Sequence, residues 1–183
     1  MKILWVALLT ALPLFTLAQE KDDDDGWNGI RAGYHSSNVD GDWGEADART
    51  GFYAGYYRNL IKVPLYRLST GLEFHTAGAS SSLSEVRLGY VSLPINNRLK
   101  LGPVYLDLGI DPALKVGETN LVNGTELDVP DDAKAERFDL LAHAGAGFKF
   151  LFLGVEVRYR RGLTEVYEGT YNTGLELGLS TFF

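Results

Sequence analysis

The end of the chain alternates strictly between apolar residues and small or polar ones. The segment reads NTGLELGLSTFF from Asn172 to Phe183, which is the period of two that an extended strand shows. A strand that runs to the last residue, is apolar on one side and ends in an aromatic is typical of the strand that closes an outer-membrane barrel against its first strand. The apolar side of this barrel-closing terminal strand is expected to carry Leu175, Leu177, Leu179 and Phe183.

Seven further segments show the same alternation, which brings the expected number of strands to eight. They span residues 30–35, 52–57, 67–75, 85–90, 104–111, 138–149 and 153–160. Between the fourth and the fifth segment, Asn96-Asn97 and Gly102-Pro103 are both plausible turns. The strand boundaries in that stretch therefore stay open.

The links between the expected strands alternate in length. Those after the first, third, fifth and seventh strands are mostly longer and polar, near residues 36–49, 77–83, 117–136 and 162–171, and the other three are short. This asymmetry is typical of extracellular loops and periplasmic turns in an up-and-down barrel. The sequence therefore predicts an all-β fold, an eight-stranded antiparallel up-and-down transmembrane β-barrel.

Two further patterns favour a barrel that crosses a membrane. Phe138 and Phe148 bracket the apolar face of one strand, and at about 3.3 Å per residue and a tilt near 40° they stand roughly 25 Å apart in height. That height matches a lipid-facing band with aromatic residues at both rims. The mean hydropathy of −0.07 also fits, because such a barrel alternates lipid-facing and lumen-facing residues.

Residues 1–18 have the pattern of an export signal. Lys2 precedes the apolar run 3–17, and Thr16-Leu17-Ala18 forms a small-residue cleavage site. An uncleaved membrane anchor is the alternative, but the run is shorter than the about 20 residues that a spanning helix needs. We expect a signal peptide of the Sec type, an acidic N-terminal tail over residues 19–26 and an outer-membrane barrel domain over 27–183.

Composition excludes several kinds of site. The chain has no cysteine, which rules out a disulfide framework, a lipid-modified N-terminal cysteine and thiolate metal sites. Its net charge of −7 argues against nucleic acid as a partner. The three histidines, His35, His75 and His143, lie in no metal-ligand or nucleophile motif. We therefore expect no cofactor, no metal ion and no catalytic residue.

Several short motifs carry a resemblance to a known family. They are GIRAGY at 29–34, GFYAGY at 51–56, the Tyr90…Pro94 spacing, GPVY at 102–105, the signal ending in LAQ and the terminal Phe183. Through them nearly the whole mature chain resembles the porin-like outer-membrane β-barrel domain family of Gram-negative bacteria, and it is similar in strand count to the small OmpA/OmpX-type barrels. The resemblance implies an outer-membrane location and an eight-stranded barrel, but no single activity. The short link near Asn96 departs from the family's usual hairpin.

The charged side chains share the face opposite the apolar one. An eight-stranded barrel is just wide enough for side chains to fill it, so we expect these charges to plug the lumen as interlocked salt bridges. In particular, Arg87 and Arg158 are expected to pair with some of the four glutamates Glu73, Glu85, Glu156 and Glu176. The expected lumen charge network comprises Arg31, Arg67, Glu73, Glu85, Arg87, Asp107, Asp139, Glu156, Arg158, Arg160 and Glu176.

The preferred hypothesis is a non-enzymatic outer-membrane protein with a structural or surface-interaction role. Its expected partners are outer-membrane lipid, lipopolysaccharide and, through the terminal strand, the barrel-assembly machinery; the oligomeric state stays open. Clustered loop acids, such as those between Asp40 and Asp47 and between Asp128 and Asp132, could bind Ca²⁺, although a solvated loop is the simpler interpretation.

Two alternatives belong to other classes. In a secreted lipocalin-like barrel the apolar face would turn inward around a small apolar ligand and the charged face would be wet. In a lipid-modifying hydrolase, Glu73 could orient His75 beside Ser69 near the rim. The position of the two faces decides between a membrane barrel and a lipocalin-like one.

Overall fold

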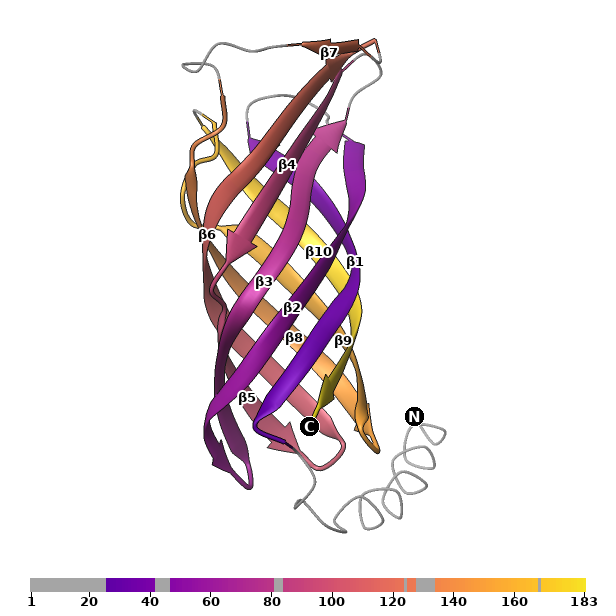
Figure 1. Ribbon diagram of the computed structural model, residues 1–183, viewed down its shortest axis with the longest axis vertical. Coiled ribbons are helices and arrows are strands. Elements are labelled where there is room, and N and C mark those ends of the chain that lie inside the picture. Colours follow the sequence, from indigo (N-terminus) through magenta and orange to yellow (C-terminus); the bar gives the residue numbers. More distant parts are fainter. Residues whose placement is uncertain (1–25, 42–46, 81–83, 124, 128–133, 168) are drawn as a thin grey trace, which may run out of the picture.

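In the computed structural model the strands close into one antiparallel barrel (Figure 1). The structure describes residues 26–41, 47–80, 84–123, 125–127, 134–167 and 169–183, so the expected signal peptide and most of the acidic tail lie outside the described residues. Its strands are β1 (Asn28–Gly41), β2 (Asp47–Val63), β3 (Tyr66–Ser80), β4 (Ser84–Ser92), β5 (Ile95–Leu101), β6 (Val104–Val122), β7 (Thr125–Leu127), β8 (Phe138–Phe150), β9 (Leu153–Gly162) and β10 (Thr170–Phe182).

These segments fill eight positions around the barrel. β4 and β5 share one position, since both pair with β3 on one side and with β6 on the other. β7 pairs only with the end of β6. The predicted eight-stranded antiparallel barrel is therefore confirmed, with Asn96-Asn97 inside a strand and the turn at Gly102-Pro103.

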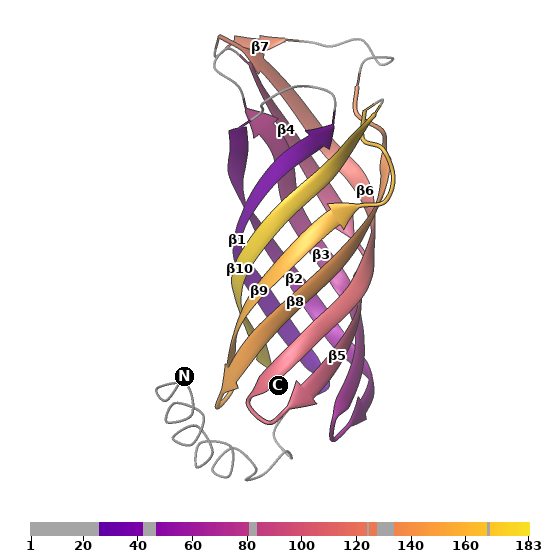
Figure 2. The same ribbon diagram turned by 180° about the vertical axis from the view of Figure 1, so that it is seen from behind.

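The last strand closes the barrel against the first. β10 pairs with β1 from Gly29 opposite Phe182 to Gly41 opposite Thr170, and with β9 on its other side. Figure 2, the view from behind, shows β8, β9 and β10 in front, completing the wall on the side opposite β3. The side chains of Leu175, Leu177, Leu179 and Phe183 are all exposed on the outside of this wall.

The two ends of the barrel differ. Three tight turns and the C-terminus lie at the lower end in Figure 1, which we call the inner end, and the longer connections lie at the upper, outer end. At the outer end the strands extend further than we expected from sequence. β1 and β2 occupy most of the predicted loop 36–49, and β6 runs on to Val122. The polar composition of these segments suggested loops. Antiparallel strands are held together by backbone hydrogen bonds, however, so they can form from polar residues whose side chains are solvated.

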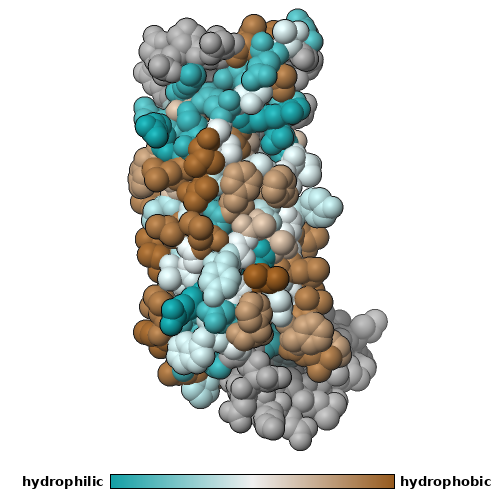
Figure 3. Space-filling model, in the orientation of Figure 1, coloured by the Kyte–Doolittle hydropathy of each residue, from teal (hydrophilic) through white to brown (hydrophobic). Residues whose placement is uncertain are grey.

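The apolar face of the sheet lies outside and the charged face inside. Leu177 and Val157 are 56% and 45% exposed, whereas Glu176 and Arg158 are 0% and 1% exposed. A space-filling view shows apolar side chains over the middle of the barrel and polar ones above them, toward the outer end (Figure 3). This arrangement suits hydrocarbon around the barrel, and it is the reverse of the lipocalin-like alternative. The part of the chain that the structure describes contains no helix suited to spanning a membrane.

Candidate functional site

A network of buried ion pairs crosses the middle of the lumen. It joins arginines from β1, β5 and β9 to carboxylates from β3, β6, β9 and β10, so residues far apart in sequence meet on the barrel axis. All of these side chains are buried. Burying a charge is costly unless it is paired, and the barrel pairs its buried charges by placing carboxylates between cations. The members are Arg31, Arg98, Arg158, Arg160, Glu73, Asp107, Asp111, Glu156 and Glu176.

Glu73 and Glu176 anchor the upper part of this network. Glu73 accepts hydrogen bonds from Arg158 (Nη2–Oε2, 3.2 Å), from Arg160 and from the Tyr57 hydroxyl. Glu176 lies 2.8 Å from Nη2 of Arg158 and 3.0 Å from Nη1 of Arg160. Two guanidinium groups thus share two carboxylates, and together they occupy the lumen.

Asp107 and Glu156 anchor the lower part. Arg98 Nη2 lies 2.7 Å from Asp107 and 3.3 Å from Glu156. Arg31 also contacts both, at 3.4 Å and 2.7 Å. The Tyr105 hydroxyl donates to Glu156 over 3.0 Å, so aromatic side chains complete the packing around the charges.

All three histidines lie inside the barrel. His35 Nδ1 is 3.3 Å from Glu176, and His143 Nδ1 is 3.0 Å from Asp111. His75 stacks on Tyr90 with ring centroids 5.3 Å apart. The hydrolase alternative places His75 near the rim, and this placement is wrong, because the residue is 1% exposed and packs inside the barrel. Within the described residues, no group of three potential ligands is placed to hold a metal ion.

Above the charged layer a small apolar core closes the outer mouth. Its buried members come from strands β3, β4, β6 and β8 and from the two connections that flank β8 and β9. They are Ala77, Leu88, Tyr90, Ala113, Ala135, Leu141 and Val166, with Val86 and Tyr167 packed against them. The segments containing Ala135 and Val166 therefore fold over the mouth of the barrel.

Glu118 fastens these two covering segments to the wall. It lies on β6 beyond Leu114, which pairs with Phe138 at the upper aromatic rim, so it is outside the hydrocarbon band. Its carboxylate pairs with Lys115 and accepts hydrogen bonds from the backbone N–H of Ala135 (3.2 Å) and from the Tyr167 hydroxyl (3.2 Å). Partial burial acts to raise the pKa of Glu118. The hydrogen bonds from Lys115, Asn120 and Tyr167, together with the charge of Lys115, outweigh burial, so the pKa lies below its usual value. Burial, together with the charge of Glu118, raises the pKa of Tyr167.

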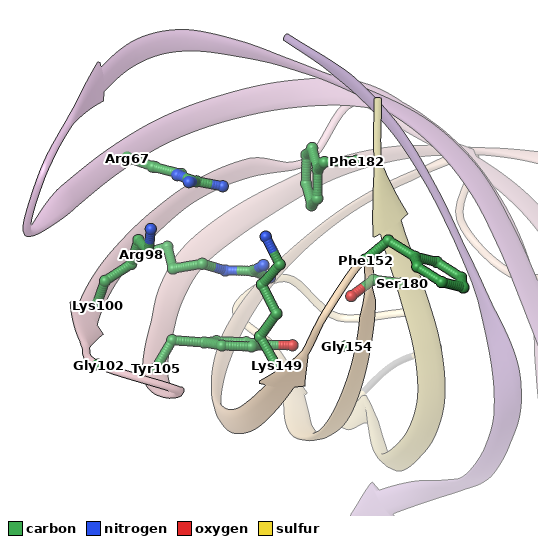
Figure 4. Close-up of a pocket in the computed structure, with 10 residues that line it drawn as sticks. All are labelled: Arg67, Arg98, Lys100, Gly102, Tyr105, Lys149, Phe152, Gly154, Ser180 and Phe182. Carbon is green, nitrogen blue, oxygen red and sulfur yellow. The ribbon is translucent and has the colours of Figure 1, made fainter. Parts of the chain in front are cut away.

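The structure sorts the predicted lumen charges into two groups. Nine are buried in the barrel, seven of them in the central network. Of the other two, Arg67 lies at the inner mouth (Figure 4) and Asp139 near the outer end, where it accepts hydrogen bonds from Asn172 (2.7 Å) and Thr164 (2.9 Å). The nine are Arg31, Arg67, Glu73, Asp107, Asp139, Glu156, Arg158, Arg160 and Glu176.

Glu85 and Arg87 require a correction, because they lie outside the lumen. Their side chains are 29% and 51% exposed, and they pair with each other (2.8 Å) and, through Glu85, with Arg49 (2.8 Å). On β4 the inward positions belong instead to Leu88 and Tyr90. Above the membrane the outside of the barrel is wet and the inside is packed, so the expectation that charges face inward fails there.

Arg98 and Asp111 are network members that we missed from the sequence. We had treated the stretch around Asn96 as a possible turn, which hid Arg98. The alternation of Asn96 and Arg98 with Leu99 and Leu101 was the signal for a strand. Asp111 lies four residues after Asp107 and so shares its face of the expected strand, but the expected network does not include it.

These features define the class of the protein: it is a small transmembrane β-barrel of the outer membrane, with a filled lumen. Among solved structures it is similar to Ail, the attachment invasion locus protein of Yersinia pestis, with a TM-score of 0.56 and 18% identity over 87% of this chain and 99% of that one. It is similar also to Neisserial surface protein A (NspA), with a TM-score of 0.55 and 12% identity over 88% of this chain and 100% of that one. No protein-family model matches the chain, and neither does any curated protein sequence. At these identities the likeness is one of fold.

Proposed function

We propose that this chain is a non-enzymatic outer-membrane protein with a surface-interaction role, which it exerts through its outer end. The observation that carries the proposal is the filled lumen. Paired charges occupy its middle and the core around Leu88 and Tyr90 closes its outer mouth, so a solute has no evident path through the barrel. The surface that remains for interaction is the set of strand ends and connections beyond the aromatic rim.

The chemistry of that outer end favours a cationic partner. Acidic residues outnumber basic ones in the sequence of the segments that leave the membrane band, near residues 36–49, 115–137 and 161–171. Opposite charge steers association and suppresses like-charged partners. Ail, which has the same fold, has been crystallised with the heparin analogue sucrose octasulfate. For this chain we infer the opposite preference, a basic polypeptide rather than a sulfated glycan.

The interior offers little support for a hydrolase. His75 is buried against Tyr90, and Ser69 is buried too, so neither is placed at a lipid-accessible rim. We further propose that lipopolysaccharide surrounds the apolar belt and that the barrel-assembly machinery recognises β10, whose alternation runs to the end of the chain.

The test compares binding of a fluorescent oligolysine peptide and of heparin to the purified chain in zwitterionic nanodiscs. We expect the peptide to bind and heparin not to bind. Replacing residues 119–134 by a two-residue Asn-Gly turn should weaken peptide binding at least tenfold while heat-modifiable gel migration persists. The matched control replaces Leu151-Phe152, at the inner end, by the same turn. The proposal would be contradicted if heparin bound more tightly than the peptide, or if the two variants bound the peptide equally.

A further inference from the structure

The tight turn that joins β8 to β9 at the inner end is apolar throughout. Its four residues are Phe150, Leu151, Phe152 and Leu153, of which Leu151 and Phe152 form the tip. Phe150 is 68% exposed and Phe152 69%, and Leu151, at 72%, is the most exposed of the described large apolar residues. Turns that face water are normally built from small or polar residues. The composition of this turn therefore needs a physical reason.

The backbone of the turn disfavours a leucine at its tip. Leu151 has a φ of 55°, in the left-handed region, where the Cβ of an L-residue crowds the following carbonyl oxygen and Gly or Asn is usual. Two other turns with a positive φ carry the usual residues, Gly102 (68°) between β5 and β6 and Asn123 (52°) between β6 and β7. A leucine at position 151 thus strains the folded turn, and its side chain has to offset that strain.

The apolar tip is continuous with the lipid-facing belt. On the outer face of this hairpin Phe148 lies opposite Val155, and both are exposed. The next outward pair, Phe150 opposite Leu153, is exposed too and leads directly into the tip. Figure 4 shows the Phe152 ring pointing away from the basic side chains of the inner mouth. The apolar surface therefore runs from the belt to the end of the turn without a polar residue on this face.

The tip also lies at the depth of the bilayer interface. At about 3.3 Å per residue and a tilt near 40°, Phe150 stands about 5 Å below Phe148, the inner aromatic of the belt. The polar layer of a bilayer is roughly 5–8 Å thick on each side of the hydrocarbon. The turn is thus short enough to end within that layer and does not need to reach the water beyond it.

We propose that the β8–β9 turn is a membrane anchor that inserts Phe150, Leu151 and Phe152 into the interface of the inner leaflet, with phospholipid as its partner. Burial of these side chains among glycerol and acyl groups is favourable, and it offsets the backbone strain at Leu151. The anchor fixes how deeply this side of the barrel sits in the membrane. It lies at the opposite end from the proposed interaction surface and does not depend on it.

The first measurement finds the depth of the tip. The chain has no cysteine, so Leu151→Cys can carry a single spin label, and Asn123→Cys, at the outer turn of similar φ, is the matched control. In phosphatidylcholine nanodiscs, oxygen, which enters lipid, should relax the label at 151 more than a water-soluble nickel chelate does, and the order should reverse at 123. Equal access of the chelate to both labels would place the tip in water, open to a protein partner, and would overturn the proposal.

The second measurement needs no label. Leu151→Asn removes the backbone strain and the apolar side chain together. With the tip in lipid, this change should lower the folding equilibrium constant in phosphatidylcholine vesicles by roughly fivefold, because the lost burial exceeds the relieved strain; with the tip in water, it should raise the constant. Leu151→Met keeps both features and should match the parent. Urea unfolding of the full chain measures all three, and a Leu151→Asn variant as stable as the parent or more stable would also overturn the proposal.

Discussion

At the residue scale, the lumen depends on carboxylates that serve two arginines each. Glu73 accepts hydrogen bonds from Arg158 and Arg160 and from the Tyr57 hydroxyl. A buried ion pair need not be more stabilising than apolar side chains of the same size. Replacing only one of the two partners, however, leaves a buried charge without compensation. The unfolding free energy that is lost when one partner is replaced therefore reports how completely the lumen is closed to water.

Replacing Glu73 by alanine should lower the free energy of unfolding by about 3–5 kcal/mol, because Arg158 and Arg160 each lose an anionic partner in a site that excludes solvent. Urea unfolding of the chain in lipid vesicles measures the change. Glu136→Ala, which removes an exposed glutamate at the outer end, should cost well under 1 kcal/mol by comparison. A loss of less than about 1 kcal/mol for Glu73→Ala would show that water reaches the arginines.

Glu85 provides a pH prediction outside the membrane band. Hydrogen bonds from Arg87 and Arg49 lower the pKa of its carboxyl from 4.5 to about 2. A lowered pKa contributes stability above the unfolded value, and this contribution is lost as the pH falls through the folded value. The contact with Arg49 should thus persist at pH 4 and be lost near pH 2. An NMR titration of the Glu85 carboxyl should have its midpoint near 2, and Arg87→Gln should move it up; a midpoint above 4 in the parent chain would exclude the ion pair.

At the scale of elements, the alternation of apolar and polar residues predicts most strands and their inward faces. It fails for a strand that passes from the hydrocarbon into water, because the inward face is then no longer the polar one. The faces of β8, β9 and β10 follow directly from sequence, because lipid and a filled lumen flank them over nearly their whole length. The inward face of β4 could not be predicted in this way. Above the membrane, Val86, Leu88 and Tyr90 pack inside the barrel, while Glu85 and Arg87 are in water outside it. On β4 the sequence does not show where the hydrocarbon ends. The expected pairing of Arg158 and Arg87 with glutamates is confirmed, by Glu73 and Glu176 for Arg158 and by Glu85 for Arg87, but the other lumen pairs could not be predicted, because the register sets them.

Gly147, on the inward face of β8, makes room for the Tyr105 side chain of β6. A Cβ at Gly147 would lie 2.2 Å from Cζ of Tyr105, whereas a Cβ at Gly117 would meet no heavy atom within 4 Å. Gly147→Ala should therefore lower the free energy of unfolding by about 1–3 kcal/mol, and Gly117→Ala should leave it nearly unchanged. Urea unfolding of both variants in the same vesicles measures the difference. Equal stability of the two variants would mean that the Tyr105 ring does not rest against Gly147.

At the scale of the whole molecule, the chain separates three layers along the barrel axis. Basic residues surround the inner mouth, paired charges fill the middle and an apolar core closes the outer mouth. Each layer has its own solvent: the inner aqueous phase, the interior shielded by hydrocarbon, and the outer aqueous phase. This order underlies our proposal that the barrel carries no solute and interacts through its outer end.

Ion conductance across a planar lipid bilayer tests the closed lumen most directly. The purified chain, inserted at a density that gives clear steps with an open porin, should produce no stable single-channel steps in 1 M KCl. The reason is that Glu73, Glu176, Arg158 and Arg160 occupy the axis as a set of mutual ion pairs. Uniform, long-lived conductance steps from the parent chain would contradict a filled lumen, and with it the proposal that the protein acts through its outer end.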